Sequence, residues 1–273
     1  MAEIQPNTIY YENCLSTMRR MPDNFIDLII TSPPYDNIRQ YEGSVHEFDF
    51  EPIARELYRV LKPGRVLVWI VGDQVKDHSE SCSSFRQALY FRKLGLNLLD
   101  TMIYEKNPIH TCSNFAYIQV FEYMFVFVKG APKITNLLYD KKNKTAGRYS
   151  HAYTREGDTL VKRKKEHQTK AFGRRTNIWK YTTGRNNTTN DTFAFEHPAV
   201  FPDDLARDHL LSWSNPGDLV YDPMAGSGTV PKVAYLHHRN YIASEVNKKY
   251  YDIIQKRLKK YLPQQKLTQE AKS

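Results

Sequence analysis

Short apolar runs separated by polar turns recur along most of the chain. Runs rich in branched and aromatic residues predict buried strands at 8–14, 25–30, 66–71, 98–104, 120–128, 219–221 and 241–244. Apolar residues at helical spacing predict helices at 52–61, 84–94, 202–213, 230–237 and 247–261, with a short helix and turn at 18–23. Because the strands are continuously apolar and helices lie between many of them, the pattern predicts an α/β fold with a parallel-type sheet covered by helices.

The pattern breaks between residues 129 and about 191, where apolar periodicity is weak and the segment is too long for an ordinary loop. Residues 129–185 hold 16 Lys or Arg and 4 Asp or Glu, a net charge of +12, while the whole chain carries +9. A block this one-sided indicates a polyanionic partner rather than only a solvated loop. We expect an inserted recognition region that is partly ordered only on binding.

The same shifts in composition predict four parts of the chain, at 1–128, 129–195, 196–262 and a polar tail at 263–273. The 273 residues are 41% hydrophobic, which is enough to bury a core. The three cysteines form no Cys-x-x-Cys pair, so neither a zinc site nor a disulfide framework is indicated, and a cytoplasmic setting is expected. No apolar run has the length of a membrane span, and the first residues lack a signal-peptide profile.

A stiff motif, Thr-Ser-Pro-Pro-Tyr at 31–35, follows the strand predicted at 25–30. Two prolines fix their own dihedral angles and bias Ser32 towards an extended conformation. The carboxyl ends of strands are where open α/β sheets bind their ligands. Taken alone, the motif is equally well explained as a Pro-Pro turn that caps a strand.

A second motif, Asp-Pro-Met-Ala-Gly-Ser-Gly-Thr at 222–229, lies between a predicted strand and a predicted helix. Gly226 and Gly228 would let backbone N–H groups approach a ligand at the start of that helix. Glu245 ends the next strand and could accept hydrogen bonds from both hydroxyls of a ribose. Neither the three-glycine dinucleotide fingerprint nor a Walker lysine is present, which disfavours nicotinamide and nucleoside triphosphate ligands.

Together, the two motifs resemble those of the S-adenosylmethionine-dependent DNA amino-methyltransferases, which act on N4 of cytosine or N6 of adenine. Four further segments carry the resemblance: Asn-Cys-Leu at 13–15, Arg-Val-Leu-Lys-Pro-Gly at 59–64, Phe-Glu-Tyr at 121–123 and His-Pro-Ala-Val-Phe-Pro at 197–202. The order of the motifs, with the basic segment between them, resembles the β group. The resemblance implies a circularly permuted Rossmann-like methyltransferase sheet with an inserted basic target-recognition region, and double-stranded DNA as the partner.

The resemblance also implies a catalytic role for Ser32, Pro33, Pro34 and Tyr35. The Ser32 hydroxyl and the Pro33 carbonyl would accept hydrogen bonds from the amino group of a base flipped out of the duplex. Tyr35 would stack on that base, with Pro34 setting its direction. Methylation at C5 of cytosine is disfavoured, because it needs a nucleophilic cysteine that usually follows proline, and no cysteine here does.

For the cofactor, the resemblance puts the 222–229 loop around the methionine part of S-adenosylmethionine and Glu245 on its ribose. Phe201 would pack near the adenine, or instead act as a hydrophobic staple before a helix, and Asn13 would lie near the adenine edge. The implied cofactor-binding residues are Asn13, Thr31, Phe201, Asp222, Met224, Ala225, Gly226, Ser227, Gly228, Thr229 and Glu245, with no metal. Met224 stands where relatives often have phenylalanine, and Asn13 where aspartate is common.

In the basic segment, Lys164, Lys165, Arg174 and Arg175 are expected to contact phosphates, which positions DNA without reading its sequence. Arg185 has a base-reading side-chain type. Serine at position 32, rather than aspartate, favours cytosine N4 over adenine N6 as the target.

Alternatives from other classes are a nucleic-acid-binding module that has lost catalysis and, more remotely, an RNA methyltransferase. The intact Ser-Pro-Pro-Tyr and Gly-Ser-Gly sequences argue against the inert module. By analogy with the family, a homodimer and a cognate restriction endonuclease are further expected partners.

Overall fold

The structure is a computed structural model that describes residues 3–35, 48–107, 116–184 and 187–270. It divides into two compact units. The larger unit comprises residues 1–136 and 177–273, and the smaller unit comprises residues 137–176.

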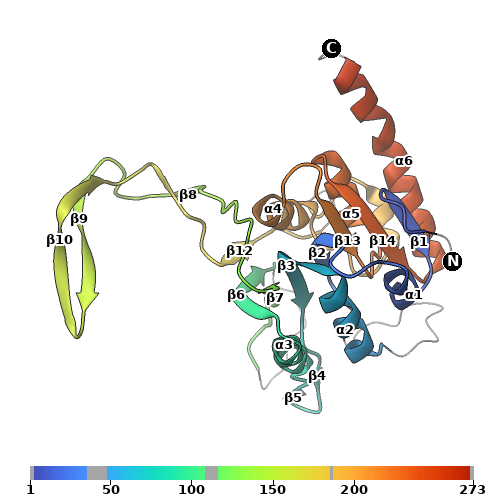
Figure 1. Cartoon of the computed structure of the whole chain (residues 1–273), viewed down its shortest axis with the longest axis horizontal. Helices are drawn as coiled ribbons and strands as arrows, with labels where there is room; N and C mark the ends of the chain where they lie inside the picture. Colours follow the sequence, from blue (N-terminus) through green and yellow to red (C-terminus); the bar gives the residue numbers. More distant parts are fainter. Residues whose placement is uncertain (1–2, 36–47, 108–115, 185–186, 271–273) are drawn as a thin grey trace. The chain divides into compact units, whose positions relative to one another are not determined.

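The larger unit is built on one mostly parallel sheet, which confirms the predicted α/β class (Figure 1). Among the described residues its eight strands follow the order β1 (Thr8–Tyr11), β14 (Asn240–Glu245), β13 (Leu219–Asp222), β2 (Ile26–Thr31), β3 (Leu61–Val71), β7 (Phe121–Val128), β6 (Asn97–Glu105) and β12 (Ile178–Lys180). Neighbouring strands are parallel except at β7, which runs antiparallel to both β3 and β6. The loops that follow β1, β14, β13, β2 and β3 therefore meet at one edge of the sheet, the edge formed by the carboxyl ends of these strands. β7 begins at that edge.

Helices cover both faces of this sheet (Figure 1). One face carries α1 (Cys14–Arg19), α2 (Phe50–Val60) and α3 (Ser83–Lys93), and the other carries α4 (Asp203–Trp213), α5 (Thr229–Leu236) and α6 (Lys248–Glu270). Short elements complete the unit: β4 (Val75–Lys76), β5 (Ser79–Glu80) and the 3-10 helix η1 (Thr192–Glu196). No helix among the described residues combines the length and apolar character that a membrane span requires.

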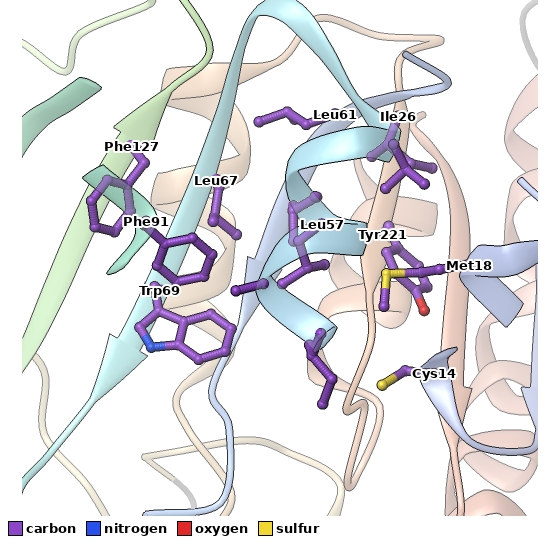
Figure 2. Packing of buried hydrophobic residues seen from close by; sticks show 14 of the residues in the cluster. Cys14, Met18, Ile26, Leu57, Leu61, Leu67, Trp69, Phe91, Phe127 and Tyr221 are labelled. Atoms are coloured by element: carbon purple, nitrogen blue, oxygen red, sulfur yellow. The ribbon is translucent and has the colours of Figure 1, made fainter. Parts of the chain in front are cut away.

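A buried cluster fixes the first helical layer against the sheet (Figure 2). Met18 of α1, Leu57 of α2 and Phe91 of α3 are fully buried in it. They pack with the sheet residues Trp69 and Tyr221, and the rings of Phe91 and Trp69 lie 5.1 Å apart, edge to face. This packing makes the sheet a rigid support for the loops at its edge.

Four predicted elements differ clearly from the structure, and one of them, the strand predicted at 66–71, begins at Leu61. The first strand ends at Tyr11 instead of residue 14, because the Asn13 side chain accepts a hydrogen bond from the Leu15 N–H (2.9 Å) and so starts α1 at Cys14. The last helix was expected to end near Tyr261, before a tail, but α6 continues past Pro263 to Glu270. The short helix lies at Cys14–Arg19 rather than 18–23.

The smaller unit contains strands that weak periodicity did not predict. β9 (Tyr149–Glu156) and β10 (Thr159–Gln168) form an antiparallel hairpin, and β8 (Lys141–Lys142) pairs with β11 (Phe172–Gly173). The hairpin turns through Gly157, which has a φ of +61°, and Asp158, a two-residue connection whose sequence is a recognised hairpin signal. The expectation that part of this region orders only on binding stays a prediction.

The boundary of the smaller unit also differs from the segment expected at 129–195. β12 belongs to the central sheet, where Ile178 pairs with Ile103 of β6, and the Trp179 side chain is buried. The 40 residues of the smaller unit hold 12 Lys or Arg and 4 Asp or Glu, so most of the basic excess lies in it. Its role as a recognition region, and the permutation of the sheet, stay predictions.

The buried cluster predicts the cost of truncating one of its residues. Leu57→Ala should lower the free energy of unfolding by about 2–5 kcal/mol, because it removes buried methyl groups and leaves a cavity. Urea denaturation at constant m-value measures this change. Leu89→Ala on α3 is the matched control, since Leu89 is 70% exposed, and should change the free energy by no more than about 0.5 kcal/mol. Equal losses in the two variants would contradict the assignment of Leu57 to the core.

Candidate active site

A buried hydrogen bond joins the two sequence motifs. The Thr31 hydroxyl at the end of β2 donates to Oδ1 of Asp222 at the end of β13, at 2.9 Å, across 191 positions of sequence. β2 and β13 are adjacent parallel strands, with Leu28 opposite Val220. The Ser-Pro-Pro-Tyr turn and the glycine loop are thereby brought side by side at one edge of the sheet.

The glycine loop is held by carboxylates at two strand ends. Asp222 accepts a second hydrogen bond from the Met224 N–H at 3.1 Å. Glu245, at the end of β14, accepts from the N–H groups of Gly226 and Asn247, each at 2.8 Å. Each carboxylate oxygen of Glu245 still has a second lone-pair direction with which to accept a bond.

The two glycines of the loop lie against other parts of the protein, and the expected close approach of a ligand to them stays a prediction. Gly226 has a φ of +53°, and a Cβ on it would lie 2.9 Å from Nε2 of His197. Gly228 has a φ of +79°, and a Cβ on it would lie 2.8 Å from Cγ2 of Ile254 in α6. Their contacts are therefore with the protein itself, and the lack of a Cβ lets the loop fold tightly against His197 and α6.

An arginine that the sequence did not single out supports the loop from its other side. Arg257 of α6 is fully buried, and its Nη1 donates to the Ser227 carbonyl (2.9 Å), the Ser227 hydroxyl (3.3 Å) and the Thr229 hydroxyl (3.2 Å). The same guanidinium donates to Asp191 and Asp203. No local sequence signal marks this role, because Arg257 lies in the last helix, about 30 residues from the loop.

Burial raises the pKa values of two carboxyl groups at this edge. The pKa of Asp222 rises to about 7 because of burial, although hydrogen bonds from Thr31 and Met224 oppose the shift. Burial likewise raises the pKa of Glu245 to about 7. Within the described part of the chain, no Lys or Arg forms an ion pair with either group. Acceptors of this kind, without a protein cation, suit a ligand that carries hydroxyl groups and a positive charge, as S-adenosylmethionine does.

The Ser-Pro-Pro-Tyr turn forms a hydrogen-bonded chain with β7. The Ser32 hydroxyl donates to the Tyr35 hydroxyl, and Tyr35 donates to Oε2 of Glu122, each at 2.8 Å. Lys106 donates to Oε1 of the same carboxylate at 2.6 Å. Pro33 is buried, whereas Ser32, Pro34 and Tyr35 are half-buried. The sequence singled out Phe-Glu-Tyr at 121–123 only as part of the resemblance, and it gave Lys106 no role.

Other expected cofactor residues have structural contacts of their own. Asn13 is exposed and caps α1. Phe201 is half-buried just before α4, and Met224 packs against the core cluster. Ala225, Ser227 and Thr229 are buried in the loop. Binding of the cofactor by these residues stays a prediction.

The thiol of Cys14 is buried, and burial raises its pKa to about 12. It is therefore protonated at neutral pH and unsuited to nucleophilic attack, which agrees with the argument against C5 methylation. Across the described residues no group of His, Cys, Asp and Glu side chains is arranged to hold a metal ion.

The expected DNA-contacting residues differ in their surroundings. Arg174 is exposed and donates to the Tyr139 hydroxyl at 3.3 Å. Arg175 is paired with Asp140, and its hydrogen bonds hold the pKa of that carboxyl below its ordinary value. Lys164 and Lys165 lie in β10. Arg185 lies outside the described residues.

Known proteins are similar to most of the length of this chain. A family model described as DNA methylase, for N6 and N4 methyltransferases, matches residues 26–256. The orphan methyltransferase M.BamHII of Bacillus amyloliquefaciens is 52% identical over 243 residues, which are 88% of this chain and 91% of that protein.

Two solved structures share the fold. The PvuII DNA methyltransferase, named as cytosine-N4-specific, has a TM-score of 0.67 at 19% identity, covering 93% of this chain and 87% of that one. TTHA0409 of Thermus thermophilus, complexed with S-adenosyl-L-methionine, has a TM-score of 0.62 at 20% identity, covering 93% and 94% of the two chains. With the family model and the 52% identical relative, the chain belongs to the N6/N4 DNA methylase family and is an S-adenosylmethionine-dependent DNA methyltransferase.

Proposed function

We propose that this enzyme transfers a methyl group to the exocyclic N4 of cytosine at a specific site in double-stranded DNA. The observation that carries the proposal is the Ser32 hydroxyl, an uncharged acceptor beside the cofactor loop, which the Thr31–Asp222 bond holds in place. The main alternative target is N6 of adenine, since a serine at this position also occurs among adenine enzymes. The name of the PvuII enzyme, which shares the fold, supports cytosine for that protein.

The proposed chemistry depends on hydrogen-bond acceptors. An exocyclic amino nitrogen is a poor nucleophile because its lone pair is delocalised into the base, so the site must favour the pyramidal nitrogen of the transition state. The Ser32 hydroxyl and the Pro33 carbonyl would accept the two amino N–H groups. Proline has no N–H, so no competing donor comes from that position. The ring of Tyr35 would stack on the flipped base.

The cofactor, when bound, supplies the methyl group on its sulfonium. Glu245 would accept the ribose hydroxyls, and the 222–229 loop would surround the methionine part. Asn13 and Phe201 would lie beside the adenine. Because Arg257 and Glu245 hold the loop from two sides, its shape is set before the cofactor binds, which favours positioning of the methyl group.

We further propose that the basic unit at 137–176 binds DNA, with a homodimer and a cognate restriction endonuclease as hypotheses that rest on family analogy. Its charge supports contact with phosphates. Tyr149 and Tyr153 are exposed on β9, with the aromatic character often found where proteins contact bases.

Nucleoside analysis tests the proposed function. DNA incubated with the enzyme and S-adenosylmethionine, then digested and measured by mass spectrometry, should contain N4-methylcytosine. N6-methyladenine alone would establish the alternative target.

Tyr35→Ala should abolish transfer while calorimetry still detects cofactor binding, because the tyrosine serves the base and not the cofactor. A wild-type protein that neither methylates DNA nor binds S-adenosylmethionine would support the inert module.

Cofactor affinity should depend on pH through Glu245. Because its pKa is raised to about 7, the carboxylate forms only as the pH rises through that value, and hydroxyl donors favour the ionised form. The dissociation constant for S-adenosylmethionine should therefore be about tenfold lower at pH 8 than at pH 6. Glu245→Gln should bind more weakly and show a flatter pH profile in calorimetry. An unchanged profile in that variant would remove Glu245 from the cofactor site.

Two adjacent arginines should contribute unequally to DNA binding. Arg174→Ala should weaken binding across sequences and reduce the slope of log K against log salt by about 1, since an exposed cation is lost. Arg175→Ala should change the slope less, because Asp140 already balances its charge. Fluorescence anisotropy at several salt concentrations measures both slopes. Equal slopes for wild type and Arg174→Ala would exclude Arg174 from the phosphate contact.

A further inference from the structure

An ion pair between two neighbouring strands touches the Ser-Pro-Pro-Tyr turn. Lys106, just after β6, and Glu122 of β7 are 2.6 Å apart, with side chains 22% and 13% exposed. Glu122 uses its other oxygen to accept from Tyr35, and Tyr35 accepts from Ser32. Four side chains from three parts of the sequence therefore form one hydrogen-bonded chain.

The chemistry of its ends fixes the direction of every bond in this chain. An ammonium group can only donate, and an ionised carboxylate can only accept. Tyr35 must therefore give its hydroxyl proton to Glu122, which leaves the Tyr35 oxygen as an acceptor for the Ser32 hydroxyl proton. Once that proton is committed, Ser32 presents only lone pairs to any other partner.

We propose that Glu122 is a positioning residue for methyl transfer, which acts through Tyr35 to keep Ser32 a hydrogen-bond acceptor towards the target amino group. The proposal rests on the proposed role of Ser32. A serine proton turned towards the amino nitrogen would compete for the lone pair that must attack the methyl group. The direction of the hydrogen bonds from Ser32 to Glu122 prevents this. The same argument applies to N4 of cytosine and N6 of adenine, since each amino group carries two N–H donors.

Backbone pairing fixes the positions of the residues that form this hydrogen-bonded chain. Glu122 lies opposite Tyr104 in the pairing of β6 with β7, and Tyr123 lies opposite Val71 at the end of β3. The Lys106 N–H donates to the Val120 carbonyl at 2.6 Å, which ties the lysine to the start of β7. A Cβ on Gly72 would lie 3.6 Å from both Glu122 and the Tyr35 ring, so the carboxylate and the ring pack on the same strand end.

Glu122→Gln tests the direction of the bonds without changing the size of the side chain. Lys106 can only donate, so it should hold the amide oxygen and turn the NH₂ group towards Tyr35. Tyr35 would then accept from Gln, donate to Ser32 and turn the serine proton towards the base. We expect kcat to fall by about 10- to 100-fold, with the dissociation constant for S-adenosylmethionine unchanged within about twofold. Glu105→Gln, which breaks the neighbouring Glu105–Lys180 pair on β6 and β12, is the control and should keep wild-type kcat.

A second substitution separates direction from simple loss of structure. Adding Lys106→Met to Glu122→Gln frees the amide to turn its oxygen towards Tyr35, so the double variant should recover part of the lost kcat. In a Tyr35→Phe background, which lacks the linking hydroxyl, Glu122→Gln should cause no further loss. The proposal would be overturned if Lys106→Met did not relieve the loss of kcat in Glu122→Gln and if that loss added in full to the loss in Tyr35→Phe. A wild-type kcat in Glu122→Gln would also overturn it. If the unchanged enzyme transfers no methyl group to DNA, the proposed function fails instead, and the inference fails with it.

Discussion

The bond between Thr31 and Asp222 is the constraint on which the rest of the site depends. It is buried, it spans 191 positions of sequence, and it joins the strand that carries the Ser-Pro-Pro-Tyr turn to the strand that carries the glycine loop. Burial raises the pKa of Asp222 to about 7, and the Thr31 hydroxyl is among the groups that stabilise its ionised form. Because β2 and β13 are parallel neighbours, a shift in their register would separate the turn from the loop.

A second buried network ties the loop to the segment that follows the basic unit. Arg257 bonds the loop on one side and Asp191 on the other, and Lys232 and Lys260 also donate to Asp191. Burial raises the pKa of Asp191, but these hydrogen bonds outweigh it and leave the pKa well below its ordinary value. Buried ion pairs add little net stability compared with apolar packing, while removal of one partner is costly. We therefore interpret the network as a device that fixes the position of the loop.

The sequence predicted those parts of the fold and site that local patterns encode. β2, β13 and β14 were visible as apolar runs, and the turn and loop residues follow them directly in the chain. Arg257 and Lys106 were not predicted, because their partners lie far away in sequence and their local surroundings resemble an ordinary helix interior and an ordinary strand end. The β9–β10 hairpin was missed because its strands carry polar residues without a buried face, although the Gly-Asp turn was a usable signal.

Hydrogen-bond acceptors dominate the edge of the sheet where the candidate site lies, and this bears on how a target base would be chosen. In the proposed function, Ser32, the Pro33 carbonyl and Glu245 would each offer oxygen lone pairs to the amino group of the base or the hydroxyl groups of the cofactor. Hydrogen bonding at Ser32 cannot by itself distinguish cytosine from adenine, since both amino groups donate two N–H bonds. In the proposed function, the choice of base therefore rests on the lack of charge at position 32 and not on the number of hydrogen bonds, since an aspartate would attract the amino group more strongly. In the same proposal, the basic unit would add affinity for DNA but not this choice, because contacts with phosphates do not depend on the base sequence.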